Sequence, residues 1–203
     1  MKKNNLKDIE EVLVVVDMVN GFVKEGPMAD PYIGHIVPMI QNMMADYLNQ
    51  DNTGVFVVKE GHSENACEFN VHPKHCIKGT KEAMLVDELS KLEPYCYEFL
   101  KNSTSAIWAK EFIETIKLLL QNPKFRKVTV VGCCTDICVM DLSIPLKKLF
   151  DELNIEVEVI IPTEAVETFN IDGIHERDEW NNMAFRFMEQ AGIKLVKKLE
   201  RGK

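Results

Sequence analysis

Residues able to act as acid, base or nucleophile each follow a short apolar segment of this 203-residue chain. They are an acid, a carboxylate–imidazole pair, an amine and a thiol: Asp17, Glu60 with His62, Lys101 and Cys138. If the apolar segments are parallel strands, their carboxyl ends meet at one edge of a sheet, where sites of such folds form. The convergence of these groups predicts a catalytic site at that edge.

The thiol of Cys138 is the candidate nucleophile. It lies in the predicted first turn of a helix that Thr135 or Asp136 can cap. Unpaired N–H groups and the positive end of the helix dipole favour a thiolate at that place. Each residue also has a plainer interpretation: a buried inert cysteine, a loop-capping Asp17 and a solvated Lys101. The three together at neighbouring strand ends favour catalysis.

The segments that must position these groups are predicted to alternate between strands and helices. Runs rich in valine and isoleucine are typical of strands covered on both faces: 12–16, 55–58, 128–131 and 157–161, with weaker candidates at 95–100 and 193–196. Apolar residues at helical spacing predict helices over 32–48, 108–120, 136–153 and 176–190. Pro38 and Pro145 lie inside two of these helices and can kink them. The order predicts a single α/β domain over 1–203, with three α/β/α layers and a mostly parallel six-stranded sheet.

Composition narrows the class of protein. The chain is 46 % hydrophobic and 28 % charged, as in an ordinary globular protein, which argues against a disordered chain. A formal net charge of −8 argues against nucleic acid or an anionic membrane surface as a partner. No apolar run approaches the ~20 residues of a membrane span, and no signal peptide is visible. The six cysteines are therefore expected to be free thiols in the cytoplasm.

Five motifs, taken in their order along the chain, resemble those of a known family. They are VLVVVDMVNGF (12–22), KEGH (59–62), HPKHCIKGT (72–80), FLKNSTSAI (99–107) and VVGCCTDICV (130–139). The sequence resembles the isochorismatase-like cysteine hydrolases, and within them the nicotinamidases and pyrazinamidases. The similarity covers nearly the whole chain, and GCCTDICV is its most specific motif.

The resemblance implies a catalytic triad of Asp17, Lys101 and Cys138. It also implies a cis peptide bond between Cys133 and Cys134, with the backbone N–H groups of Cys134 and Cys138 forming an oxyanion hole. Asp17 would take the thiol proton, and the thiolate would attack an amide carbonyl to form a thioester. The expected partner is thus a small-molecule amide substrate.

A second group of side chains could bind one divalent metal ion. Imidazoles of His62 and His75 and carboxylates of Glu60 and Glu68 are suitable ligands, although four charged loop residues are the plainer interpretation. The resemblance matches all four to metal ligands of nicotinamidases, with Glu60 in place of the more usual aspartate. Zinc, iron(II) and manganese stay open. The ion would orient the substrate through its pyridine nitrogen, directly or through water.

Aromatic residues are expected to line the substrate pocket, because a flat pyridine ring stacks on them. By resemblance Phe22 is one, and His72 stands where nicotinamidases place Trp or Phe. Trp108 is expected to replace an aromatic residue missing after the catalytic lysine. His35 and His175 have no counterpart and are expected at the surface or at a helix end.

Three functions remain open at this point. The first is a nicotinamidase of NAD salvage, which converts nicotinamide to nicotinate and ammonia. The second is a related cysteine hydrolase of another small amide or ureide, and the third is a non-catalytic binding member of the family. The complete triad argues against the third, and the absence of G-x-G-x-x-G after the first strand excludes a Rossmann dehydrogenase. A homo-oligomer is expected for a compact metabolic enzyme.

Overall fold

A parallel β-sheet forms the centre of the computed structural model, which describes residues 1–199; residues 200–203 of the predicted domain lie outside the described part. The strand order is β3-β2-β1-β4-β5-β7, and the short β6 also pairs with β4. Within residues 1–199 every strand pairing is parallel. The seven strands are β1 (Glu11–Val16), β2 (Thr53–Glu60), β3 (Tyr97–Lys101), β4 (Lys127–Cys133), β5 (Glu158–Pro162), β6 (Val166–Glu167) and β7 (Lys194–Val196).

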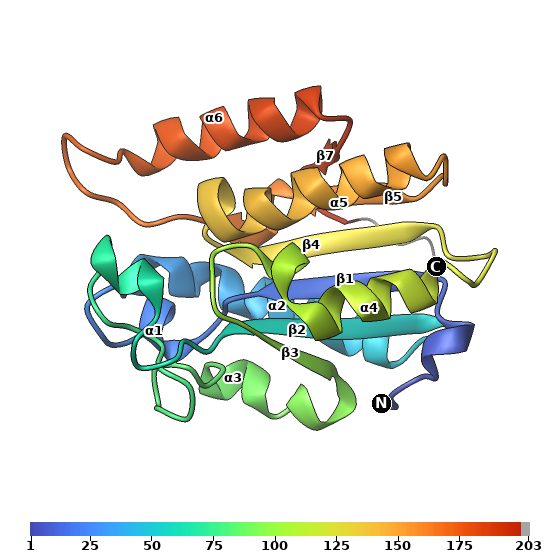
Figure 1. The fold of residues 1–203 in the computed structure, drawn as a ribbon, viewed down its shortest axis with the longest axis horizontal. Coiled ribbons are helices and arrows are strands. Elements are labelled where there is room, and N and C mark those ends of the chain that lie inside the picture. The colour runs from blue at the N-terminus through green and yellow to red at the C-terminus, as the bar shows by residue number, and fades with distance from the viewer. Residues whose placement is uncertain (200–203) are drawn as a thin grey trace.

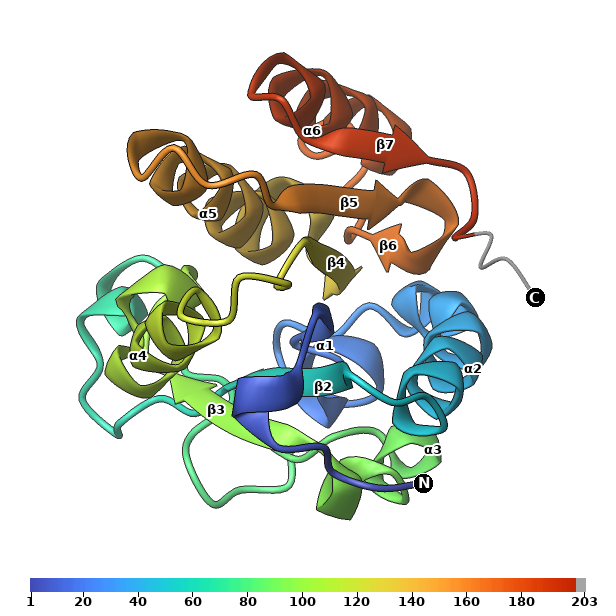
Figure 2. The same cartoon turned by 90° about the vertical axis from the view of Figure 1, so that its right-hand side faces the viewer.

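Helices cover both faces of this sheet (Figure 1, Figure 2). Side chains of β1 alternate between two buried clusters, so both faces of this strand are apolar. Val12, Val14 and Val16 share one cluster with residues of α4, α5 and α6, whereas Leu13 and Val15 share the other with residues of α2. The helices are α1 (Asn20–Val23), α2 (Val37–Leu48), α3 (Asp87–Ser90), α4 (Lys110–Leu119), α5 (Met140–Glu152) and α6 (Arg177–Gln190).

The predicted α/β/α fold is confirmed, and the differences are local. All six predicted strands are present, but β6 was missed because two residues give no hydrophobic pattern. The helix predicted over 32–48 begins as a 3-10 helix over Pro31–Ile36, and α2 proper starts at Val37. Pro38 therefore lies in the first turn of α2, where a missing N–H is harmless, while Pro145 does lie inside α5. Among residues 1–199, none of the helices has both the length and the apolar character that crossing a membrane requires.

Candidate active site

The carboxyl ends of four neighbouring strands carry the predicted groups. Asp17 directly follows β1, while Glu60 and Lys101 end β2 and β3 and lie opposite each other in register. Gly132 near the end of β4 has φ of +117°, and a Cβ there would lie 2.0 Å from the Val16 carbonyl oxygen. Only glycine permits this close approach, which brings the end of β4 against β1.

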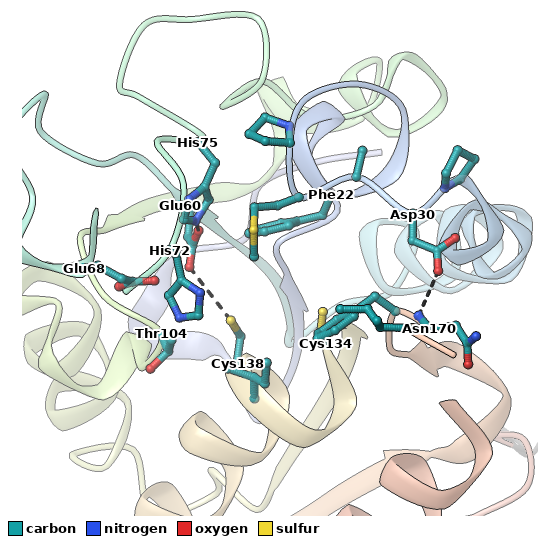
Figure 3. Close-up of a pocket in the computed structure, with 17 residues that line it drawn as sticks. Phe22, Asp30, Glu60, Glu68, His72, His75, Thr104, Cys134, Cys138 and Asn170 are labelled. Atoms are coloured by element: carbon teal, nitrogen blue, oxygen red, sulfur yellow. Dashed lines mark hydrogen bonds and ion pairs between the residues drawn. The ribbon is translucent and has the colours of Figure 1, made fainter. Parts of the chain in front are cut away.

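The three predicted triad residues lie together and are buried. Lys101 Nζ is 2.9 Å from Asp17 Oδ2 and 3.7 Å from Cys138 Sγ. Glu60 is a fourth member: its Oε1 lies 2.6 Å from Lys101 Nζ and 3.9 Å from Cys138 Sγ (Figure 3). The backbone N–H of Glu60 also donates to Asp17 Oδ1 over 2.8 Å. The sequence assigned Glu60 to the metal alone, whereas the structure places it in contact with the triad as well.

Burial dominates the electrostatics of this cluster. It raises the pKa of Asp17 to about 6, against the opposing effect of the Lys101 ammonium. Burial also raises the pKa of the Cys138 thiol well above its usual value, again opposed by Lys101, so the resting group is a thiol. For Glu60 burial is outweighed by the Lys101 charge and by hydrogen bonds from His62 and His75, and its pKa lies well below the usual range. Asp17 is thus the carboxylate suited to exchange protons near neutral pH.

The turn that carries Cys138 differs in detail from the predicted helix start. Cys133 and Cys134 are joined by a cis peptide bond, as the resemblance implied. A π-helical turn, Thr135–Val139, follows before α5 begins. The predicted side-chain cap is wrong: neither Thr135 nor Asp136 caps this turn, and the Asp136 carboxyl group is instead hydrogen-bonded to His175. The oxyanion hole of Cys134 and Cys138 stays a prediction.

The four predicted metal ligands form a second cluster beside the triad. Donor atoms of Glu60, His62, Glu68 and His75 all lie within 4.8 Å of one another. Glu60 Oε2 is 3.1 Å from His62 Nε2 and 3.0 Å from His75 Nε2, and His62 Nε2 is 3.9 Å from Glu68 Oε1. The loop over 61–85 makes this possible, because it returns to the end of β2 through a bridge between His62 and Ile77.

The donor set fits a divalent ion such as zinc, iron(II) or manganese. His75 Nδ1 donates to the Pro73 carbonyl oxygen over 2.8 Å, so in the neutral ring the lone pair of Nε2 faces the cluster and can bind a metal ion, whereas in the protonated ring Nε2 donates to Glu60. Asp17, Glu60 and Glu68 together bring three carboxylates against the single ammonium of Lys101. Two negative charges are then uncompensated when all are ionised. A divalent cation, or protonation of both histidines, would neutralise them.

A cavity of about 340 Å³ opens beside Cys138 (Figure 3). This volume is at the small end of ligand pockets, which run from ~300 to 1,000 Å³, so it suits a small substrate. Phe22 and His72, which were predicted for the substrate pocket, both line this cavity. Trp108 does not line it, and that prediction is wrong: the side chain is 81 % exposed, on a 3-10 turn (Ala106–Trp108) that directs it to the surface.

Part of the pocket wall could not be found from the sequence patterns. Met28 and Asp30 come from the loop after α1, and residues 169–171 come from the loop between β6 and α6. Phe169 supplies the aromatic ring that Trp108 was expected to give. Two features of the sequence could have pointed to these loops. Pro27 and Pro31 flank residues 28–30, and a long segment without a pattern separates the predicted strand 157–161 from the predicted helix 176–190.

Comparison with known proteins agrees with this geometry. The family model of the isochorismatase domain matches residues 11–197. The chain belongs to the isochorismatase family. The family resemblance stated from the motifs is therefore confirmed, and the chain is an isochorismatase-family hydrolase.

Two curated proteins are similar in sequence to this chain. It is 26 % identical over 176 residues to a Bacillus subtilis protein described as an uncharacterized isochorismatase family protein, PncA, covering 81 % of this chain and 90 % of that one. It is 29 % identical over 150 residues to nicotinamidase 1 of Arabidopsis thaliana, covering 66 % of this chain and 59 % of that protein.

Solved structures share the fold. A pyrazinamidase of Pyrococcus horikoshii in complex with zinc superposes with a TM-score of 0.74 at 22 % identity, covering 93 % of this chain and 99 % of that one. An N-carbamoylsarcosine amidase of Thermoplasma acidophilum reaches the same TM-score of 0.74 at 21 % identity, with coverages of 96 % and 100 %. At these identities the likeness establishes the fold, and the substrate has to be argued from the site.

Proposed function

We propose that this protein is a cysteine-dependent amidohydrolase whose substrate is nicotinamide, cleaved to nicotinate and ammonia. The observation that carries the proposal is the buried cluster of Asp17, Lys101 and Cys138 at the wall of a 340 Å³ cavity. The similarity to nicotinamidase 1 of Arabidopsis thaliana supports the choice of substrate.

Asp17 acts as the base in the first step. With its pKa at about 6 it is mostly ionised at neutral pH and can take the Cys138 proton, whereas Glu60, of low pKa and bound to Lys101, is a poor acceptor. The thiolate is stabilised by the Lys101 ammonium 3.7 Å away and attacks the amide carbonyl carbon. The backbone N–H groups of Cys134 and Cys138 would bind the oxyanion.

Asp17 then returns its proton to the departing nitrogen, which leaves as ammonia, and a thioester to Cys138 remains. The same carboxylate next takes a proton from water, and the water oxygen attacks the thioester carbonyl. The C–S bond breaks, Asp17 returns the proton to the Cys138 sulfur, and the acid loses its proton to solvent and leaves as nicotinate. One amide and one water are consumed for one acid and one ammonia. Lys101 keeps its charge throughout, because the carboxylates of Asp17 and Glu60, and the Cys138 sulfur when it is a thiolate, raise its pKa well above the usual value despite its burial.

The second cluster would hold the divalent ion of the enzyme. Glu60, His62, Glu68 and His75 would be its protein ligands, and the ion would supply a Lewis acid that orients the pyridine nitrogen. Glu60 links the two clusters, since Oε1 contacts Lys101 while Oε2 faces both imidazoles. The zinc in the pyrazinamidase of Pyrococcus horikoshii supports a metal here.

Hydrolysis of a ureide is the second candidate. The fold is equally similar to an amidase of N-carbamoylsarcosine, and Thr104 in the pocket wall is polar where nicotinamidases are expected to place an aromatic residue. A ureide would use the same nucleophile and base but would need no aromatic wall. Phe22, Phe169 and His72 around the cavity favour the planar ring of nicotinamide instead.

Ammonia release separates these candidates. The purified protein would be assayed with nicotinamide, pyrazinamide and a panel of small aliphatic amides and ureides, with Cys138→Ala as the matched control. We expect turnover of nicotinamide that the control lacks. Turnover of a ureide without turnover of nicotinamide or pyrazinamide would reject the first proposal in favour of the second.

A further inference from the structure

A buried histidine–aspartate pair lies directly behind the pocket wall. His175 Nε2 is 2.9 Å from Asp136 Oδ2, and His175 Nδ1 is 3.1 Å from the backbone carbonyl oxygen of Phe169. The sequence placed His175 at the surface or at a helix end. It does lie just before α6, but its side chain is buried.

The ring of His175 contacts an aromatic ring on each face and a hydrogen-bond partner at each nitrogen. It stacks between Phe169, at 3.9 Å between ring centroids and 12° between planes, and Trp180, at 4.5 Å and 14°. Both of its nitrogens face acceptor oxygens, but a neutral imidazole has only one N–H to donate. Both hydrogen bonds therefore form together only when either the imidazole carries a second proton or Asp136 is protonated. The other Asp136 oxygen, Oδ1, is buried and has no hydrogen-bond partner among residues 1–199. Asp136 therefore depends on His175 for its side-chain bonding.

This pair joins two walls of the cavity that come from distant parts of the chain. Asp136 belongs to the turn whose Cys134, Ile137 and Cys138 line the cavity. His175 closes the loop whose residues 169–171 line it on another side, through a backbone bridge between Ile171 and His175. The hydrogen bond between the two side chains thus links the turn that carries Cys138 to the loop that contains residues 169–171.

We propose that His175 is a positioning residue: it holds loop 169–171 at a fixed distance from the turn of Cys138 and so sets which substrates the pocket admits. The inference deepens the proposed function, on which it rests for the nature of the substrate. His175 itself does not line the cavity; it acts on the cavity wall through the hydrogen bonds of its side chain to Asp136 and Phe169 and through its backbone bridge to Ile171. Loss of the hydrogen bond between His175 and Asp136 should widen the pocket and weaken its selection of substrates by size.

Three variants of His175 separate positioning from simple stability. In His175→Gln a flat amide remains between the rings, and its nitrogen can still donate to Asp136. The shorter side chain of His175→Asn can reach the Phe169 carbonyl but not Asp136, and His175→Ala makes neither bond. The matched control is Ile116→Ala, a truncation on the buried face of α4, away from the pocket lining.

The first readout needs no turnover. Cys138 would be alkylated with iodoacetamide, a small reagent, and with the bulkier N-ethylmaleimide, and the two rates compared by peptide mapping. For the Ala and Asn variants we expect the rate ratio of bulky to small reagent to rise roughly 10-fold, short of the ~100-fold that a misplacement of about 1 Å can cause. The Gln variant and the Ile116→Ala control should stay within about 3-fold of the parent.

The second readout uses the amide that the parent turns over fastest. The Ala and Asn variants should raise KM by about 10-fold with kcat nearly kept, as expected for lost binding contacts, and the Gln variant should restore KM. An unchanged reagent ratio in the Asn variant, or a Gln variant as altered as the Ala variant, overturns the inference. Altered ratios in a protein without amide turnover would reject the proposed function and leave this inference supported.

Discussion

Replacement of Lys101 by methionine tests the arrangement of the buried charges most directly. Methionine keeps the length and much of the volume of lysine but removes the ammonium. Lys101 Nζ is the cation next to both Asp17 and Glu60, at 2.9 and 2.6 Å, and all three side chains are almost completely buried. Lys101→Met therefore leaves the carboxylates of Asp17 and Glu60 without the positive charge that compensates them.

The expected loss is large for a single substitution. Removal of one partner from a buried ion pair typically costs about 3–5 kcal/mol in the free energy of unfolding, out of the ~5–15 kcal/mol that stabilises a folded protein. For a chain of this size each kcal/mol lowers the melting temperature by about 2–4 °C, so we expect a decrease of roughly 6–20 °C. Lys194→Met is the matched control: it breaks an exposed pair of similar length, 2.8 Å to Glu158, and should cost less than about 1 kcal/mol.

A double-mutant cycle in urea identifies the cause. All proteins would be measured with a chelator present, so that bound metal does not contribute to stability. If the cost comes from uncompensated carboxylates, Glu60→Gln in the Lys101→Met background removes one of them and should recover about 1–3 kcal/mol. A Lys101→Met protein as stable as the Lys194→Met control would refute the reasoning. So would a double variant no more stable than Lys101→Met.

Three further predictions follow from the site. Because Asp17 must be ionised to act as base and its pKa is raised to about 6, kcat/KM should fall about 10-fold between pH 7 and pH 5, as measured in initial-rate assays over pH 5–8; a flat profile would exclude Asp17 as the base. Elemental analysis of protein purified without chelator should find about one divalent ion per chain, and joint replacement of His62 and His75 by alanine should remove it; full activity after metal removal would leave the cluster without a role. Brief alkylation should modify Cys138 before Cys133, in proportion to inactivation and with protection by nicotinate, whereas inactivation that tracks Cys133 would remove the nucleophile assignment.

The positions of the chemical groups along the fold could be predicted from the sequence. Apolar runs identified β1, β2 and β4 to within two residues at each end, and the rule that carboxyl ends of parallel strands meet at one edge brought Asp17, Lys101 and Cys138 together. The periodic patterns also gave the four long helices. These features depend on local hydrophobic patterning, which the chain carries in consecutive residues.

Contacts between side chains far apart in the sequence were decided by the tertiary structure. The Glu60 carboxylate places one oxygen against Lys101 and the other against the two histidines, an arrangement that only the register of β2 and β3 and the return of the loop over 61–85 reveal. Trp108 turns to the surface, and Phe169 occupies the pocket wall instead. His175, a residue without a counterpart in the motifs, pairs with Asp136 across 39 positions of the chain. Spacing alone gives no signal for such partners, because they are selected by packing between elements and by the need to satisfy buried charges.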